Sequence, residues 1–299
     1  MKVIKKEPSE PKKPKTGSKL GSAIKTGIAG LAVATGFTGV LAGLTTYASP
    51  EKFTTTDDIA QQFSIVETAG GTYYGSLVKS LFTGEGEFKY LDGATYTGEF
   101  QDSMRAGEGT YTWPNGDTFT GTWNDDQMYD GTYQFADGSS FTGILLESEF
   151  TDGTFDLGSS CEQKGFSSFK ATIEAGEIVS VEFALPDGTK YKGELTGKAD
   201  ITYPSGAEYS GQVRSGERSG EGRFVWKSLG AIEAYYNGNW VLGQMSGPGE
   251  YHFGSGTYPY LEGTFVDGRP DGKATYYKES GNTFETTWSN GKCTKVKET

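Results

Sequence analysis

Residues 96–113 read YTGEFQDSMRAGEGTYTW, and this stretch decides the fold. Large residues alternate with small or polar ones at both of its ends, in Tyr96–Phe100 and again in Gly109–Trp113. Side chains at i, i+2 and i+4 of a strand share one face. The stretch therefore predicts a β-hairpin with rings and glycines on one face and threonine and glutamate on the other.

Both halves of this pattern recur along the chain, which predicts a repeat of hairpins. Turn signals such as Asp92-Gly93 and Asn115-Gly116 follow the second half of the pattern. The first half, aromatic-x-Gly-x-large, begins at ten positions, some of them degenerate: Tyr73, Tyr96, Phe119, Phe141, Phe169, Tyr191, Tyr209, Tyr236, Leu261 and Phe284. The second half, Gly-x-aromatic-x-large, begins at nine, again with worn copies: Gly86, Gly109, Gly131, Gly153, Val181, Ala199, Gly222, Gly249 and Ala274.

The alternation also predicts how the hairpins pack. A ring on one strand fits over a glycine on the neighbouring strand, where no side chain blocks it. One hairpin cannot bury its ring face alone, whereas stacked hairpins can. We therefore expect an all-β chain, an elongated antiparallel sheet of roughly nineteen strands, with Tyr111 and Trp113 in the core.

The pattern resembles the MORN (membrane occupation and recognition nexus) repeat, which pairs Tyr-x-Gly with a later Gly-x-Gly. The Gly-x-Gly elements here are Gly84-Glu85-Gly86, Gly107-Glu108-Gly109, Gly220-Glu221-Gly222 and Gly247-Pro248-Gly249. The resemblance covers residues 73–291 and weakens in residues 158–190. It implies a scaffold or membrane-linked organiser, and no catalytic domain accompanies the repeats in this sequence.

The N-terminal region has a different composition. Residues 1–25 are rich in Lys and Pro and predict a disordered cytoplasmic tail. Residues 26–49 carry no charge, and their length predicts a single transmembrane helix with the repeat body outside the cell. Cleavage as a signal peptide near Ala48 is the alternative. Gly36, Gly39 and Gly43 share one helix face, a pattern that favours self-association of such helices.

The remaining boundaries follow from these patterns. Residues 50–72 predict a junction with a short amphipathic helix, capped by Thr55, that covers the first repeat. Its apolar face would hold Ile59, Phe63 and Val66. Residues 73–292 form the repeat array, and residues 293–299 are expected to be a C-terminal tail.

The charge of the chain limits its partners. Residues 1–50 hold eight Lys and two Glu, a balance of +6, and the whole chain is −12, so residues 51–299 carry −18. An acidic body argues against binding to nucleic acid and to anionic lipid surfaces.

Few residues in the chain suit catalysis. The single histidine, His252, lies between Tyr251 and Phe253 and is expected to point to the solvated face. Cys161 and Cys293 lie too many strands apart for a disulfide. Carboxylate pairs for glycoside hydrolysis would have to come from Asp125-Asp126 or from outward Glu85, Glu108 and Asp130. We expect no enzyme activity, cofactor or metal site.

Three functions remain open. The first is a membrane-anchored scaffold that presents an acidic β-surface to a protein partner. The second is an extracytoplasmic module that binds glycan or lipid head groups with exposed rings. The third is a hydrolase that uses outward carboxylates.

Overall fold

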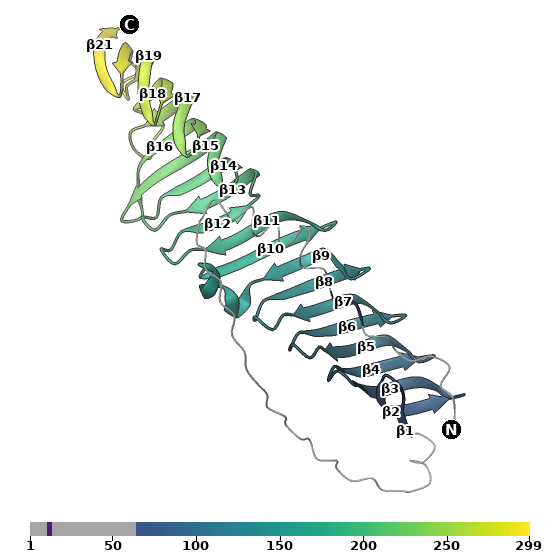
Figure 1. Cartoon of the computed structure of the whole chain (residues 1–299). Coiled ribbons are helices and arrows are strands. Elements are labelled where there is room, and N and C mark those ends of the chain that lie inside the picture. The colour runs from purple at the N-terminus through teal and green to yellow at the C-terminus, as the bar shows by residue number, and fades with distance from the viewer. Residues whose placement is uncertain (1–10, 14–63) are drawn as a thin grey trace. The chain divides into compact units, whose positions relative to one another are not determined.

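The structure is a computed structural model that describes residues 11–13 and 64–299 (Figure 1). The described residues group into two compact units, one holding 11–13, 64–160 and 173–177, and the other holding 161–172 and 178–299. Strands make up nearly all of both units, and two short 3₁₀ turns, η1 (Gly158–Ser160) and η2 (Glu162–Lys164), are the helical elements in them. The all-β prediction is confirmed.

In the first unit, strands β1 to β9 pair in the order of the sequence, each antiparallel to the next. Their bounds are β1 (Ser64–Glu67), β2 (Gly71–Val78), β3 (Leu81–Tyr90), β4 (Thr95–Gln101), β5 (Met104–Thr112), β6 (Thr118–Asn124), β7 (Gln127–Gln134), β8 (Ser140–Leu146) and β9 (Glu149–Asp156).

The second unit follows the same plan, and β11 to β21 pair consecutively and antiparallel. The strands that lie wholly or mainly in this unit are β10 (Ser168–Glu174), β11 (Glu177–Ala184), β12 (Lys190–Gly193), β13 (Gly197–Thr202), β14 (Glu208–Arg214), β15 (Glu217–Ser228), β16 (Ala231–Val241), β17 (Gln244–His252), β18 (Tyr260–Val266), β19 (Arg269–Tyr277), β20 (Thr283–Ser289) and β21 (Lys292–Glu298). The expected length of the complete array stays a prediction.

The register places like residues opposite each other. From β2 to β9 one cross-strand row consists of glycines alone, and the neighbouring row consists of rings alone. The glycine row is Gly75, Gly86, Gly98, Gly109, Gly121, Gly131, Gly143 and Gly153, and the ring row is Tyr73, Phe88, Tyr96, Tyr111, Phe119, Tyr133, Phe141 and Phe155. In the second unit Val181, Ala199 and Ala274 occupy the glycine row, as their worn copies of the pattern predicted.

The structure corrects the two ends of the predicted array. Ser64–Glu67 forms β1, paired with β2, so Val66 belongs to a strand and the predicted helix is wrong there. The rest of that segment lies outside the described residues. The predicted tail at 293–299 is also wrong, because Lys292–Glu298 forms β21 and pairs with β20. Both errors have one cause: strands at the ends of a sheet bury few side chains, so they carry little of the repeat pattern.

The core is the ring face. Tyr111 and Trp113 are buried, as predicted, at 0% and 1% exposure. A Cβ added to Gly98 would lie 2.4 Å from the Cα of Gly109, so the glycine row also lets neighbouring strands approach closely.

Two core substitutions are expected to destabilise the fold. Trp113→Ala should lower the free energy of unfolding by about 3–5 kcal/mol, as for other buried aromatic side chains. Gly98→Val should also destabilise, because its Cβ would lie 2.4 Å from the next strand. Urea denaturation of the full chain measures both. Thr97→Val is the matched control on the exposed face, with a change within about 0.5 kcal/mol. Equal urea midpoints for all three variants would contradict the assignment of the two faces.

Candidate functional site

Hydrogen bonds fix the tyrosines of the ring face in place. The Tyr96 ring lies over Gly109 of the next strand, where an added Cβ would be 2.2 Å from the Tyr96 hydroxyl. The same hydroxyl donates a 3.0 Å hydrogen bond to the Glu99 carbonyl, at the bulge where pairing with β5 shifts. Three other tyrosine hydroxyls donate to the backbone carbonyl three residues later in the chain: Tyr73 to Ser76, Tyr209 to Gln212 and Tyr236 to Asn239. These tyrosines are therefore packing groups.

Burial changes the ionisation of these phenols. Desolvation raises the pKa of Tyr73, Tyr209 and Tyr236 to about 12, because the charged form would lose its hydration inside the sheet. In Tyr209 the nearby Arg218 offsets part of that rise. The protonated form is thus part of the folded state.

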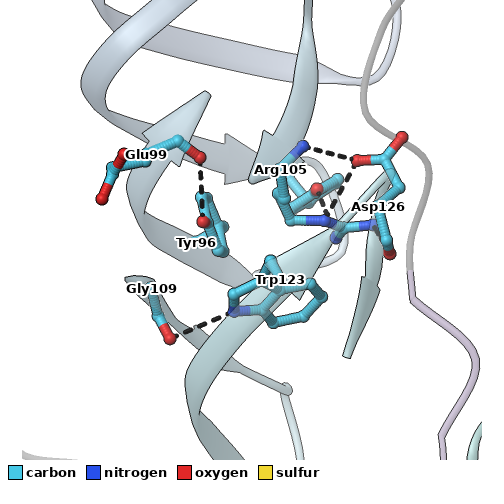
Figure 2. Close-up of polar contacts among 7 residues, drawn as sticks. Tyr96, Glu99, Arg105, Gly109, Trp123 and Asp126 are labelled. Carbon is cyan, nitrogen blue, oxygen red and sulfur yellow. Dashed lines mark hydrogen bonds and ion pairs between the residues drawn. The ribbon is translucent and has the colours of Figure 1, made fainter. Parts of the chain in front are cut away.

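A buried arginine breaks the apolar pattern of the ring face (Figure 2). Arg105 is 0% exposed, and its guanidinium carbon lies 4.7 Å from the centre of the Trp123 ring and 5.8 Å from that of Tyr96. Its Nε lies 3.2 Å from Oδ1 of Asp126, and its Nη2 donates a 3.1 Å hydrogen bond to the Asp126 carbonyl. The backbone N–H of Arg105 donates to the same carboxylate at 2.8 Å. Arg105 therefore ties β5 to the turn between β6 and β7.

Arg105 occupies a position that is apolar in neighbouring hairpins. It pairs with Phe100, the large residue that closes the first pattern, just as Phe82 pairs with Leu77 and Met128 with Trp123. Arg218 repeats the arrangement in the second unit, 4.5 Å from the centre of the Trp240 ring. Neither arginine was predicted from the repeat pattern. The signal in the sequence was a charged residue at a strand position whose side chain faces the buried ring face.

The outward face of the first unit is polar and regular. From β4 to β9 one cross-strand row consists of threonines: Thr97, Thr110, Thr120, Thr132, Thr142 and Thr154. Two pairs within it, Thr110–Thr120 and Thr132–Thr142, are hydrogen-bonded at 3.0 Å. Acidic residues lie beside this row, with Glu85 opposite Glu99.

The carboxylates considered for catalysis lie in two places. Glu85, Glu108 and Asp130 are exposed on the outward face, where Glu108 accepts a 2.9 Å hydrogen bond from Thr122. Asp125 and Asp126 lie in the turn between β6 and β7, and Asp126 is the partner of Arg105. The fold does not bring the two groups together as one site.

The outward face of the second unit holds a groove with a volume of about 1400 Å³. Its floor is the glycine row, including Gly238 and Gly249. Its walls are polar side chains of both charges, among them Glu221, Asn239, Glu250, Glu262, Lys273, Tyr277 and Lys297.

The prediction that His252 is solvated is wrong, because its side chain is 4% exposed. It does point away from Tyr251, but neighbouring rings cover it. Its ring stacks on Tyr235 at 4.1 Å and on Tyr260 at 4.8 Å between centres, and Nδ1 lies 2.8 Å from the Thr257 carbonyl. The cross-strand partners, which the single-strand pattern did not show, bury it.

Other predicted sites can be placed in part. Cys161 is buried before β10, and Cys293 is exposed in β21. Among residues 11–13 and 64–299, no group of three or more His, Cys, Asp or Glu is placed to hold a metal ion. In the same ranges, no helix is long and apolar enough to cross a membrane. The predicted span at 26–49, with Gly36, Gly39, Gly43 and Ala48, lies outside them.

Comparison with known proteins identifies the repeats. Residues 96–118, 209–230, 236–258 and 262–283 match the family model described as the MORN repeat. The chain therefore contains MORN repeats, as the resemblance implied. An 86-residue stretch is 37% identical to Alsin of Mus musculus, and an 85-residue stretch is 34% identical to Alsin of Homo sapiens. Each covers 28% of this chain and 5% of the relative, so the chain spans a small part of those proteins.

Two solved structures align with most of the chain. The wild-type TCP10 domain of Danio rerio CPAP aligns with 79% of this chain and 95% of its own, at 12% identity and a TM-score of 0.25. The SAS-4 (dCPAP) TCP domain of Drosophila melanogaster, in complex with a proline-rich motif of Ana2 (dSTIL), aligns with 86% of this chain and 97% of its own. That alignment has 11% identity and a TM-score of 0.19. At these TM-scores neither structure adds to the assignment of a fold or partner.

The Arg105 cluster is expected to act in stability. Asp126→Asn should cost about 3 kcal/mol, because it leaves the Arg105 charge buried without its counter-charge. Arg105→Met should cost less, because it removes both the charge and the need for a partner, and because Met128 fills the same position in the next hairpin. Asp125→Asn, in the same turn and exposed, is the control. Thermal or urea unfolding measures all three, and a larger loss for Arg105→Met than for Asp126→Asn would contradict this account.

Alkaline pH is expected to unfold the sheet through its tyrosines. Below pH 10.0, the ordinary phenol value, both folded and unfolded chains keep the phenol proton, and stability is retained. As the pH rises from there through about 12, the unfolded chain ionises first, so stability is lost. Tyrosinate absorbance and circular dichroism, recorded together, should show the buried tyrosines ionising as the sheet melts. Ionisation of all 18 tyrosines near pH 10 with the sheet intact would contradict the prediction.

Proposed function

We propose that this chain is a scaffold whose outward face binds a protein partner. One observation carries the proposal: the rings are buried in packing between strands, while an ordered polar surface faces outward over many successive strands. In the first unit this surface is the threonine row with acidic neighbours such as Glu85 and Glu108. Repeat proteins use extended surfaces of this kind to bind other proteins.

The charge favours a basic partner. Residues 51–299 carry −18, from −12 for the chain and +6 for residues 1–50. A basic protein would be steered to the acidic face, and its binding would weaken as salt shortens the Debye length from about 10 Å at 0.1 M to 3 Å at 1 M.

Binding without catalysis is part of the proposal. Catalytic carboxylates are usually placed where burial or a close like charge separates their roles. Glu85, Glu108 and Asp130 are exposed on a strand face, and Asp126 is held by Arg105. These positions support a binding surface better than a hydrolase site.

The groove of the second unit supports a second candidate, the binding of a glycan or a lipid head group. Tyr277 lines the groove beside Glu262 and donates a 2.9 Å hydrogen bond to it. The Tyr277 ring stacks on Tyr260 at 4.3 Å between centres. Aromatic side chains with a few placed polar groups in a concave surface are typical of small-molecule sites.

A membrane anchor is an alternative form of the proposal, and it rests on the sequence alone. Residues 26–49 would anchor the chain, with a cytoplasmic N-terminus and an extracytoplasmic body, and Gly36, Gly39 and Gly43 would pair two anchors. Deletion of residues 21–49 should then release the chain from the membrane fraction. Recovery of the intact full-length chain in the soluble fraction without detergent would contradict the anchor.

The scaffold proposal predicts salt-sensitive protein binding that depends on the outward acids. The full chain should capture a basic partner at about 0.1 M salt and release it near 1 M. Glu85→Lys combined with Glu108→Lys should abolish capture, whereas Glu147→Lys, in the turn between β8 and β9, should not. Sedimentation with anionic vesicles should show weak binding. Strong salt-sensitive vesicle binding would overturn the proposal, and so would glycan turnover that Glu108→Gln or Asp130→Asn abolishes.

A further inference from the structure

One carboxylate lies at a position where the corresponding turns of the repeat place an uncharged side chain. The turn between β5 and β6 is closed by a 2.9 Å hydrogen bond from the Trp113 N–H to the Asp117 carbonyl. Five corresponding turns end at uncharged residues, of which Ala94, Ser139 and Ala207 are buried, Thr189 is half-buried and Asn282 is exposed. Asp117 is also buried, at 7% exposure. Burying a charge is costly unless partners compensate it, so the partners of Asp117 matter.

Two of these partners come from the neighbouring strand and its turn. The Tyr133 hydroxyl donates to Oδ2 of Asp117 at 2.9 Å, and the Ala136 N–H donates to Oδ1 at 2.9 Å. Neither brings a positive charge. The only cation that reaches the carboxylate among the described residues is Lys13 of the N-terminal segment.

Lys13 is 104 residues from Asp117 in the sequence. Its Nζ lies 3.0 Å from Oδ2 of Asp117 and 5.7 Å from the centre of the Trp113 ring. Pro11, two residues before it, is buried, whereas Lys12 between them is exposed. The three residues are the short purple segment of Figure 1 and belong to the first unit. The contact thus combines a charge-assisted hydrogen bond, a ring face for the cation and an adjacent buried proline.

The charge state of Asp117 also fits a site for a cation. Burial by itself would raise the pKa of Asp117, but hydrogen bonds from Asn115, Ala136, Lys13 and Tyr133 outweigh it and lower that pKa. The carboxylate is therefore kept charged in a buried place.

We propose that Trp113, Asp117 and Tyr133 form a recognition site for a Pro-x-Lys peptide, and that Pro11–Lys13 fills this site in cis. The chain has a basic N-terminal region, +6 over residues 1–50, and an acidic body, −18 over residues 51–299. Because Pro11–Lys13 is tethered to the same chain as the site, an external basic peptide must displace it. The proposal deepens the proposed function, because it names a peptide class that a partner would present.

The contact also bears on the predicted topology. It requires Lys13 and Asp117 to share one compartment. A single span at residues 26–49 would place Lys13 and Asp117 on opposite sides of a membrane in either orientation. The contact and that membrane anchor are therefore alternatives for any one molecule.

The first experiment maps the contact in the full chain. A carbodiimide joins an amine to a carboxylate that it touches, with loss of water, and peptide mass spectrometry locates the new amide. We expect a Lys13–Asp117 link, little linkage of Lys12 to Asp117, and none in Asp117→Asn. Mixing isotope-labelled and unlabelled chains should give links within one chain. Equal linkage of Lys12 and Lys13, or links solely between chains, would overturn occupation in cis.

The second experiment tests recognition in trans. A labelled peptide of residues 8–15 is titrated into the full chain and followed by fluorescence anisotropy. Lys13→Ala should bind it about tenfold more tightly than the unchanged chain, because the tail then competes less. Lys12→Ala, the matched control, should bind like the unchanged chain. Adding Asp117→Asn to Lys13→Ala should remove the gain, with circular dichroism confirming the fold.

These results separate the site from the scaffold proposal. Equal peptide affinity in all four proteins would overturn the Asp117 site. Capture of a basic protein by the outward acids is measured independently, and Asp117→Asn should leave it unchanged. Loss of capture in Glu85→Lys with Glu108→Lys, while the peptide still responds to Asp117→Asn, would confirm that the two surfaces are distinct.

Discussion

The fold depends on one contact: a tyrosine or phenylalanine ring of one strand lies over a glycine of the next. Tyr96 over Gly109 shows its requirements. Gly109 has no room for a Cβ, and β4 and β5 must pair in the observed register. The Tyr96 hydroxyl must also reach the Glu99 carbonyl at the bulge. Each hairpin that satisfies them presents the same two rows to its neighbour. A row of glycines beside a row of rings is therefore the unit that the chain repeats.

This contact also determines what is left for binding. Rings that cover glycines are buried, so the opposite face carries the polar residues that meet solvent or a partner. Function should then lie in that face or at departures from the rule. Arg105 is one departure, and its charge is compensated within the hairpins by Asp126. Asp117 is another, and its counter-charge comes from Lys13, about a hundred residues away in the chain. A departure that is compensated from outside the repeat is a better candidate for recognition than one compensated inside it.

The same contact explains how much the sequence predicted. Each internal strand carries half of the pattern, so even the worn copies at Phe169 and Val181 predicted strands that the structure contains. Burial that comes from a cross-strand neighbour was not predictable in this way. His252 is covered by Tyr235 and Tyr260, which belong to other strands. The edge strands β1 and β21 have a partner on one side, and their sequences carry little of the pattern. The buried role of Asp117 was not predicted, because Asn115-Gly116 is enough to predict the turn and marks Asp117 only as a turn residue.

The most direct test of this account is a double-mutant cycle on Tyr96 and Gly109, measured by urea denaturation of the full chain. Tyr96→Ala and Gly109→Val should each destabilise the first unit. If the ring occupies the space that the new Cβ would take, the double variant should lose less than the sum of the two, by about 1–3 kcal/mol. Losses that add to within about 0.5 kcal/mol would show that ring and glycine act independently, and would contradict the contact on which the account rests.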